Sequence, residues 1–398
     1  MPKSELRHVL DDELDAIAER MPPLEAAARA FWLHPEEPRL LMWGHLPMMH
    51  EAPNPADGTI TERELYRQLQ NQIKPAMEAR EYGFDNVPII YPHDCHYRGP
   101  AFRTHFLAVV MGAEVKYPVG TPKSKMDGYR AWVDPIVDDL GDLQALREIN
   151  VSESPALSAV LQSYEEIEEI VRGRISMTHY SPTLPLDFAA EMIGHVRFYE
   201  LIASDPDGTL EYVQVCTAKW LEMMRLQEAA ALGRWANSLY EPGLHAGDMI
   251  LPYLSPTNIR QVVLPYNRLL AEAYDGLVAG IGHRDSSLLA DYLRIPSLYG
   301  CSVHEDWPAE LVINQLSGTQ VLLLGFSWHY HHGKPQEAPV CLPWSTCCRV
   351  LAQYAGELRV HVTLTGWGAT PEEKRECLLD DLAELRRVWE TGSPETSR

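Results

Sequence analysis

Short apolar runs alternate with longer amphipathic stretches along most of the chain. The runs are nearly continuous in apolar character, which is typical of strands that are covered on both faces in a parallel sheet with crossover helices. Eight such runs occur, over residues 39–47, 86–95, 174–182, 233–242, 277–285, 295–306, 320–333 and 358–368. Eight strand–helix units predict an α/β fold of the (β/α)8 TIM-barrel class.

Helix start signals stand between these runs. Asp205-Pro206, Ser255-Pro256 and Thr370-Pro371 each place a capping side chain before a proline, and proline is favoured at the first position of a helix. The first run is not followed by a Gly-x-Gly-x-x-Gly turn, so the signature of a doubly wound nucleotide-binding sheet is missing. We expect a single barrel over residues 35–390, an N-terminal helical extension over 1–34 and a flexible tail over 391–398.

Composition excludes several classes of protein. The 398 residues carry 56 Asp and Glu against 34 Lys and Arg, a formal charge of -22, so a nucleic acid or an anionic membrane surface would be repelled. No apolar run reaches the roughly 20 residues of a membrane-spanning helix, and the first 21 residues form a charged amphipathic pattern without a secretory core. The seven cysteines form no C-x-x-C pair. We therefore expect a soluble cytoplasmic protein without a disulfide framework.

Histidines gather where the predicted strands end. Seven of the sixteen lie at or just beyond the carboxyl end of a run, and an eighth follows the fourth run by three residues: His45, His93, His96, His179, His283, His304, His329 and His245. A single histidine in such a place is often a hydrogen-bonded structural residue. In a barrel, however, these ends meet at one mouth, where active sites of this fold are built, so the cluster indicates an enzyme.

Two segments at this mouth hold the most reactive combinations. In YPHDCHYRG, Asp94 stands between histidines and can act as a general acid or base, or orient a ligand. In GHRD, His283 and Asp285 are two residues apart, so on an extended strand end they would face the same way and could share one metal ion. Further ligands would have to come from other strands; those in reach are Glu241, His245, Asp248 and His179.

The order of these segments resembles the uroporphyrinogen decarboxylase superfamily, which includes zinc-dependent methyltransferases that act on corrinoid proteins. The similarity rests mainly on DMILPYLSPTNIRQVVLPYNRLLAEAYDGLVAGIGHRD, where a Leu-Ser-Pro helix start is followed by a Pro-Tyr helix and a strand ending in histidine. FDNVPIIYP, MGAEVKYP, AAEMIGHVRFYELIASDPDGTLEYVQ and TLTGWGATPEEKRECLLDDL are similar to other parts of the family pattern. The resemblance covers roughly residues 35–390 and implies the same barrel.

The chain departs from both branches of that family. The porphyrinogen-clamping arginines are missing from LMWGHLPMMH, and tryptophan stands at position 367, where the decarboxylases have the histidine of Gly-His-Gly. A substrate with eight carboxylates needs cationic partners, so porphyrinogen decarboxylation is not expected. The methyltransferase branch uses a His-x-Cys pair and a later cysteine as zinc ligands, whereas Asp285 stands at the first cysteine position here. A harder site of histidine and carboxylate, or no metal, would fit better.

The resemblance implies an enzyme that moves a methyl group between a small methylated substrate and a corrinoid protein, assisted by a divalent metal, most simply zinc. A homodimer is compatible with it, although no segment identifies an interface. The expected acid–base residues are Asp94, His179 and His304; the expected substrate contacts are His45, His93, His96, Arg98 and Trp367; the expected metal ligands are His283, Asp285, His245 and Glu241. Two alternatives stay open: a decarboxylase or other lyase acting on a small acid, and a barrel without catalytic activity that binds a partner.

Overall fold

The fold was analysed in a computed structural model. It describes residues 3–34, 37–45, 61–92, 105–116, 132–180, 184–304, 306–316, 318–325, 344–365 and 371–394. The predicted site residues Asp94, His93, His96, Arg98 and Trp367 lie outside these ranges. The structure therefore shows the frame of the mouth and part of its side chains.

Helices and parallel strands alternate through most of these ranges. The strands are β1 (Arg39–His45), β2 (Val115–Lys116), β3 (Trp132–Val133), β4 (Leu244–Ala246), β5 (Leu277–Gly280), β6 (Leu298–Ser302), β7 (Val321–Gly325) and β8 (Arg359–Thr365). The α-helices are α1 (Lys3–Ala18), α2 (Met21–Leu33), α3 (Glu62–Glu81), α5 (Phe106–Val110), α6 (Leu143–Glu148), α7 (Pro155–Val171), α8 (Pro185–Ile193), α9 (His195–Ser204), α10 (Pro206–Ala230), α11 (Pro256–Asn258), α12 (Leu264–Ala273), α13 (Leu288–Tyr292), α14 (Ala309–Leu316), α15 (Trp344–Tyr354) and α16 (Pro371–Thr391). Short 3-10 turns cover Leu140–Asp142, Val151–Glu153 and Leu251–Tyr253, and a π-helical turn over Ile259–Val263 joins α11 to α12.

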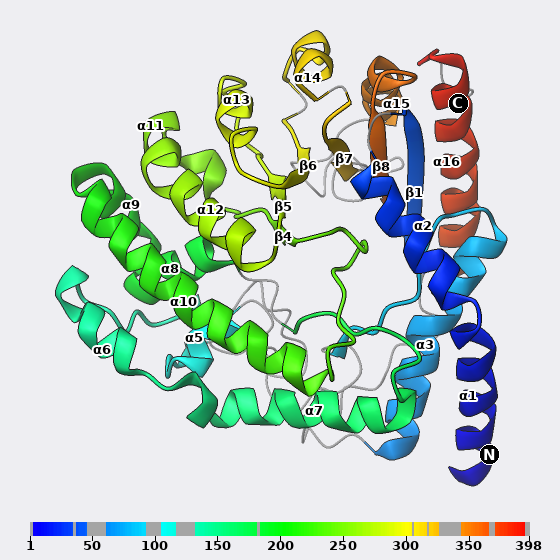
Figure 1. Ribbon diagram of the computed structural model, residues 1–398, viewed down its shortest axis with the longest axis horizontal. Helices are drawn as coiled ribbons and strands as arrows, with labels where there is room; N and C mark the ends of the chain where they lie inside the picture. The colour runs from blue at the N-terminus through cyan, green and yellow to red at the C-terminus, as the bar shows by residue number, and fades with distance from the viewer. Residues whose placement is uncertain are drawn as a thin grey trace.

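Six strands form one parallel sheet in the order β1-β8-β7-β6-β5-β4, and helices α12 to α16 follow its outer side (Figure 1). The runs near 90 and 177 contribute only isolated parallel bridges, from Ile90 to Met177 and from Met177 to Trp235. This order is that of a barrel-like α/β fold. Among the described residues the eight predicted strands do not close into one continuous ring.

The fourth strand differs from its prediction. Residues 233–242 were expected to be extended, but β4 begins only at Leu244. Tyr240 and Gly243 adopt left-handed backbone conformations with φ of 54° and 71°, which interrupt extended pairing. A Cβ on Gly243 would lie 2.2 Å from the backbone of Gly276, so only glycine allows this close approach.

The two faces of the sheet differ in chemistry. One row across the paired strands is apolar throughout: Leu40, Val360, Leu322, Cys301, Ala279 and Ala246. The next row, on the opposite face, mixes leucines with polar and small residues: Leu41, His361, Leu323, Ser302 and Gly280. His245 pairs with Val278, which pairs with Gly300, and neighbours in register point to the same side. His245 therefore lies on the inner face, which Gly300 also occupies.

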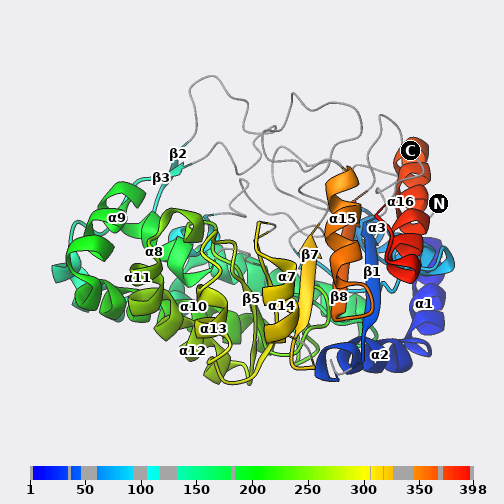
Figure 2. The same cartoon turned by 90° about the horizontal axis from the view of Figure 1, so that it is seen from above.

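Helix α2 covers the inner face at the end where the strands begin (Figure 2). The Trp32 ring stacks on His361 at 5.7 Å between centroids, and its Nε1 donates to the Leu239 carbonyl at 3.3 Å. A Cβ on Gly300 would lie 3.0 Å from the Trp32 ring. Arg359 donates to the carbonyl of Phe31 at 3.0 Å. Access to the inner face is therefore left to the carboxyl ends of the strands.

Within the described ranges, every helix is too short or too polar to cross a lipid bilayer.

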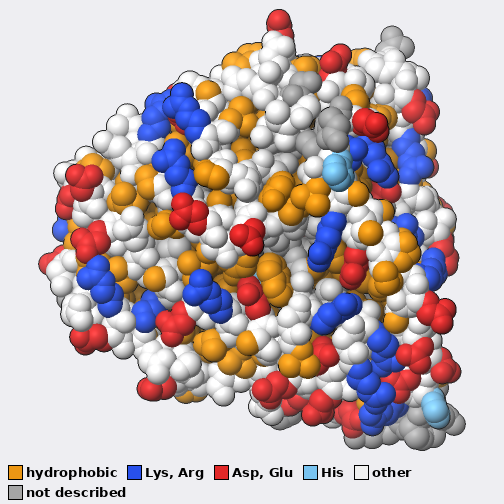
Figure 3. Space-filling view, viewed as in Figure 1, with side chains coloured by type: hydrophobic (Ala, Val, Ile, Leu, Met, Phe, Trp, Pro, Cys, Tyr) orange, Lys and Arg blue, Asp and Glu red, His pale blue; other side chains and the backbone are white. Residues whose placement is uncertain are grey.

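Acidic and basic side chains are interspersed over the face seen in Figure 3, so the negative net charge does not form one continuous acidic patch on that face.

Candidate functional site

His245 is the histidine that the structure places most favourably for chemistry. It lies on β4, and its side chain keeps 37% of its surface exposed although its strand neighbours Leu244 and Ala246 are buried. Its Nδ1 lies 3.3 Å from Oε1 of Glu241, whose side chain is fully buried. The other Glu241 oxygen accepts the Leu239 N–H at 2.8 Å. We call Glu241 and His245 the His–Glu pair.

The His–Glu pair has a clear chemical consequence. Oε1 of Glu241 has no hydrogen-bond partner, so its contact with Nδ1 is electrostatic. A carboxylate beside Nδ1 favours the ring orientation that turns Nε2 away from it. Among the described residues, nothing is paired with Nε2 of His245. Nε2 can therefore give or take a proton, or bind a ligand, at the accessible side of the ring.

His283 and Asp285 do not form the shared site that their spacing predicted. Strand β5 ends at Gly280, so His283 lies in a turn. Its Nδ1 accepts the Asp285 N–H at 2.9 Å, and its Nε2 donates to the Leu254 carbonyl at 3.1 Å. The Asp285 carboxylate accepts the Ser287 N–H at 2.9 Å, and its hydrogen bonds with Ser287 lower the pKa of this carboxyl. Both ring nitrogens of His283 are thus occupied within the protein.

A substitution tests this structural role. We expect His283→Ala to lower the free energy of unfolding by about 1–3 kcal/mol, because it leaves the Leu254 carbonyl and the Asp285 N–H without these partners. Urea denaturation measures the change. The exposed His8 on α1 is a matched control, and His8→Ala should stay within about 0.5 kcal/mol of the unsubstituted protein. An equal effect of both substitutions would show that the two bonds of His283 do not hold the turn.

The two other predicted acid–base residues within the described ranges occupy separate places. His179 is 7% exposed; its Nε2 lies 3.0 Å from Glu228, and its ring packs against Trp235 with centroids 4.7 Å apart. His304 follows β6, and its Nδ1 accepts the Asp306 N–H at 3.2 Å. His45 is the last residue of β1, where its backbone pairs with Thr365 of β8. No described contact joins any of these histidines to His245.

A pair of buried carboxyls lies beyond the end of β4, and sequence reasoning found only half of it. Asp248 was expected as a further metal ligand within reach, whereas Asp187, in the first turn of α8, was not predicted. Asp248 accepts the Asp187 N–H at 3.4 Å and the hydroxyl proton of Tyr266. Burial raises the pKa of both carboxyls above the ordinary range. We call Asp187 and Asp248 the acid pair.

These contacts show whether the expected metal ligands lie close enough together to share one ion. Within the described part of the chain, no three His, Cys, Asp or Glu side chains come close enough together to hold an ion. Glu241 stands behind His245 as its orienting partner, and both nitrogens of His283 are bonded elsewhere. The four predicted ligands therefore do not fit a shared site as they lie.

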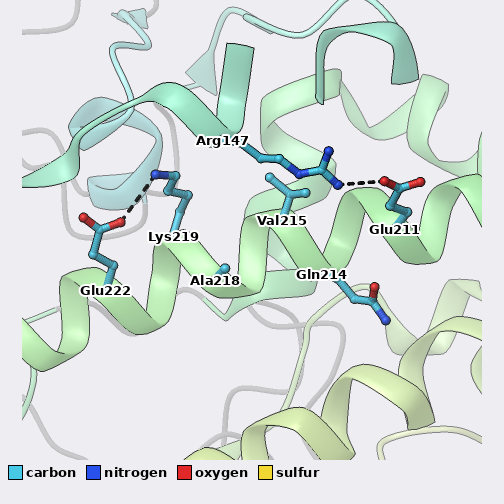
Figure 4. Close-up of a pocket in the computed structure, with 7 residues that line it drawn as sticks. All are labelled: Arg147, Glu211, Gln214, Val215, Ala218, Lys219 and Glu222. Carbon is cyan, nitrogen blue, oxygen red and sulfur yellow. Dashed lines mark hydrogen bonds and ion pairs between the residues drawn. The ribbon is translucent and has the colours of Figure 1, made fainter. Parts of the chain in front are cut away.

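A separate hollow lies on the outer surface and is a weaker candidate for the functional site than the surroundings of His245. It has a volume of about 330 Å³ and lies along α10 opposite α6 (Figure 4). Its cations are already paired: Arg147 with Glu211 at 2.7 Å, and Lys219 with Glu222 at 3.4 Å. The hollow thus offers little unpaired charge to a ligand.

Comparison with known proteins supports the class of fold. No protein-family model matches the sequence, and no curated protein matches it. The sheet and its helices define a barrel-like α/β fold, and among solved structures a methyltransferase from Methanosarcina mazei shares it. That structure superposes with a TM-score of 0.57 at 15% identity, over 90% of this chain and 97% of the other. At this identity the likeness concerns the fold, and the uroporphyrinogen decarboxylase superfamily remains a prediction.

Proposed function

We propose that this chain is a methyltransferase-like enzyme that moves a methyl group between a small methylated substrate and a corrinoid protein. The observation that carries the proposal is the His–Glu pair on the inner face, with His245 the middle residue of the short strand β4. The similarity to a methyltransferase over 90% of the chain supports the choice of reaction.

The proposed chemistry needs a proton donor or acceptor beside the methylated heteroatom. When the methyl group leaves for the electron pair of the acceptor, the heteroatom keeps the bonding pair and takes a proton. In the opposite direction the heteroatom must lose a proton before it attacks. Nε2 of His245 can serve both directions, because Glu241 holds the ring from the other side.

The same arrangement is also how proteins orient a histidine that binds a metal. Zinc, which the resemblance implies, would lower the pKa of a bound substrate group. His245 would be one residue able to hold it. Elemental analysis of the purified protein, repeated on His245→Ala, tests this part: a metal lost in the variant supports a site at His245.

The reaction itself is tested with a free corrinoid. Purified protein is mixed with cob(I)alamin and, in turn, a methylated amine, thiol and alcohol, and the loss of cob(I)alamin absorbance is followed. We expect methylation from at least one donor class, with the rate lost in His245→Ala. A rate that does not depend on the protein with any donor would contradict the proposal.

One alternative rests on the same histidine. A decarboxylase needs a single acid to protonate a carbanion-like product, and Nε2 of His245 could supply that proton. Release of carbon dioxide from a small acid, at a rate unchanged by corrinoid, would favour the lyase.

A further inference from the structure

The loop after β4, residues 247–254, is tied down at both of its ends. Near its start, the Asp187 carboxylate accepts the Met249 N–H at 2.9 Å and the Ile250 N–H at 3.1 Å. At its far end, the Leu254 carbonyl accepts Nε2–H of His283 at 3.1 Å. The loop therefore connects α8 and the turn after β5 to the strand that carries His245.

The acid pair makes the first of these ties reciprocal. The Asp187 carboxylate binds the backbone that follows Asp248, while the Asp248 carboxyl binds the backbone N–H of Asp187 at 3.4 Å. Tyr266 of α12 donates its hydroxyl proton to Asp248. Three elements, α8, the loop and α12, thus meet at two carboxyl groups that are hidden from water.

Burial and mutual repulsion decide where the proton of the pair resides. Burial raises the pKa of Asp248, and the neighbouring Asp187 raises it further. Burial also raises the pKa of Asp187, but the Met249 and Ile250 donors act against it by stabilising the ionised form. The other titratable groups that face the pair are Glu191, His195, Tyr199, Tyr266 and Tyr292. Asp248 therefore holds a proton more firmly than Asp187 does.

We propose that Asp187 and Asp248 are positioning residues that lock the loop over 247–254 and thereby hold His245, three residues before Asp248, in its orientation toward the substrate. The part of this inference that concerns His245 rests on the proposed function. The lock itself rests on the hydrogen bonds between the two segments.

Hydrogen exchange of the full-length protein tests the lock without any turnover. We expect Asp187→Asn to speed exchange of the Met249 and Ile250 amides on the order of tenfold, because an amide group cannot accept both N–H bonds. Asp205→Asn is a matched control: Asp205 caps α10 by accepting the Gly208 N–H at 3.0 Å and lies outside the loop, so it should leave these amides unchanged. Unchanged exchange in Asp187→Asn overturns the proposal.

The pH dependence of hydrogen exchange shows whether the lock depends on a proton held by Asp248. As the pH rises, ionisation of Asp248 should lower the protection factors of Met249 and Ile250 in the unsubstituted protein. Asp248→Asn stays neutral and should keep them constant. The unfolding free energy should likewise fall with pH relative to Asp248→Asn, since the native protein holds a proton that the unfolded chain has released. Parallel profiles for both proteins overturn the proposal.

Failure of the lock and failure of the proposed function give different results. A protein that methylates no corrinoid rejects the function, and the exchange data then still decide whether the loop is locked. If the function holds, Asp248→Asn should widen the pH range of activity on its alkaline side relative to the unsubstituted protein. A rate in Asp248→Asn that falls at the same alkaline pH as in the unsubstituted protein counts against a positioning role.

Discussion

His245→Ala is expected to lower the rate of methyl transfer by roughly 10²–10⁴-fold, the contribution of a positioned general acid or base. The substitution removes the ring whose Nε2 faces the accessible side, while the fold should remain because the side chain is 37% exposed. Single-turnover loss of cob(I)alamin measures the rate, and far-UV circular dichroism checks that the variant is folded.

Glu241→Gln tests the partner of His245 and should lower the rate less than His245→Ala does. Glutamine keeps the size of the buried side chain and removes its charge, so the ring of His245 is still packed but less firmly oriented. We expect a loss of roughly 10–100-fold, the usual effect of removing an orienting partner. His8→Ala, on the exposed side of α1, is the control and should keep the full rate. Full activity in His245→Ala would exclude the His–Glu pair as the centre of the reaction.

Trp32→Ala is expected to cost about 3–5 kcal/mol of unfolding free energy, the range for removing a large aromatic side chain from a core. The ring is 1% exposed, stacks on His361 and packs against Gly300. Trp32→Phe should cost less, because it keeps an aromatic ring, although it loses part of the indole packing and the hydrogen bond to the Leu239 carbonyl. Urea denaturation followed by circular dichroism measures the unfolding free energy of the unsubstituted protein, Trp32→Ala and Trp32→Phe.

The neighbouring Leu33 supplies the control on the same helix. Its side chain is 47% exposed, so Leu33→Ala should change the unfolding free energy by about 0.5 kcal/mol or less. If Trp32→Ala cost no more than Leu33→Ala, helix α2 would not be packed into the sheet in solution as the structure shows.

Much of the frame follows from local sequence signals. Five of the eight apolar runs contain the strands β1, β5, β6, β7 and β8. The predicted helix starts at Pro206 and Pro256 are confirmed, with Asp205 and Ser255 acting as caps. These strands and helix starts depend on residues that are close together in the chain, so they can be predicted from the sequence alone.

The remaining strands depend on features that apolar character does not report. Pro88 and Pro92 remove backbone donors around Ile90, so this run contributes one bridge instead of a ladder. The left-handed Tyr240 displaces the fourth strand to Leu244. A non-glycine residue with positive φ carries no clear signal in a single sequence.

Sequence patterns identified several residues of the site but not how these residues are arranged. Glu241 and His245 were expected as joint metal ligands, but the turn between them puts the carboxylate behind the ring. His283 and Asp285 were expected on a strand, but β5 ends three residues earlier. Asp187 gave one usable signal, a charged residue within the apolar segment LPLDFAAEMI. Its partner is 61 residues away, a distance that no periodicity spans.

Helix α2 also constrains the order in which the molecule can be completed during synthesis. It leaves the ribosome well before Arg359, which binds the carbonyl of Phe31 and lies 328 positions further along the chain. Until that segment has emerged, Trp32 can reach Leu239 and Gly300, but α2 lacks its contacts with Arg359 and His361 of β8. We therefore expect the final attachment of α2 to the sheet to wait for the synthesis of β8.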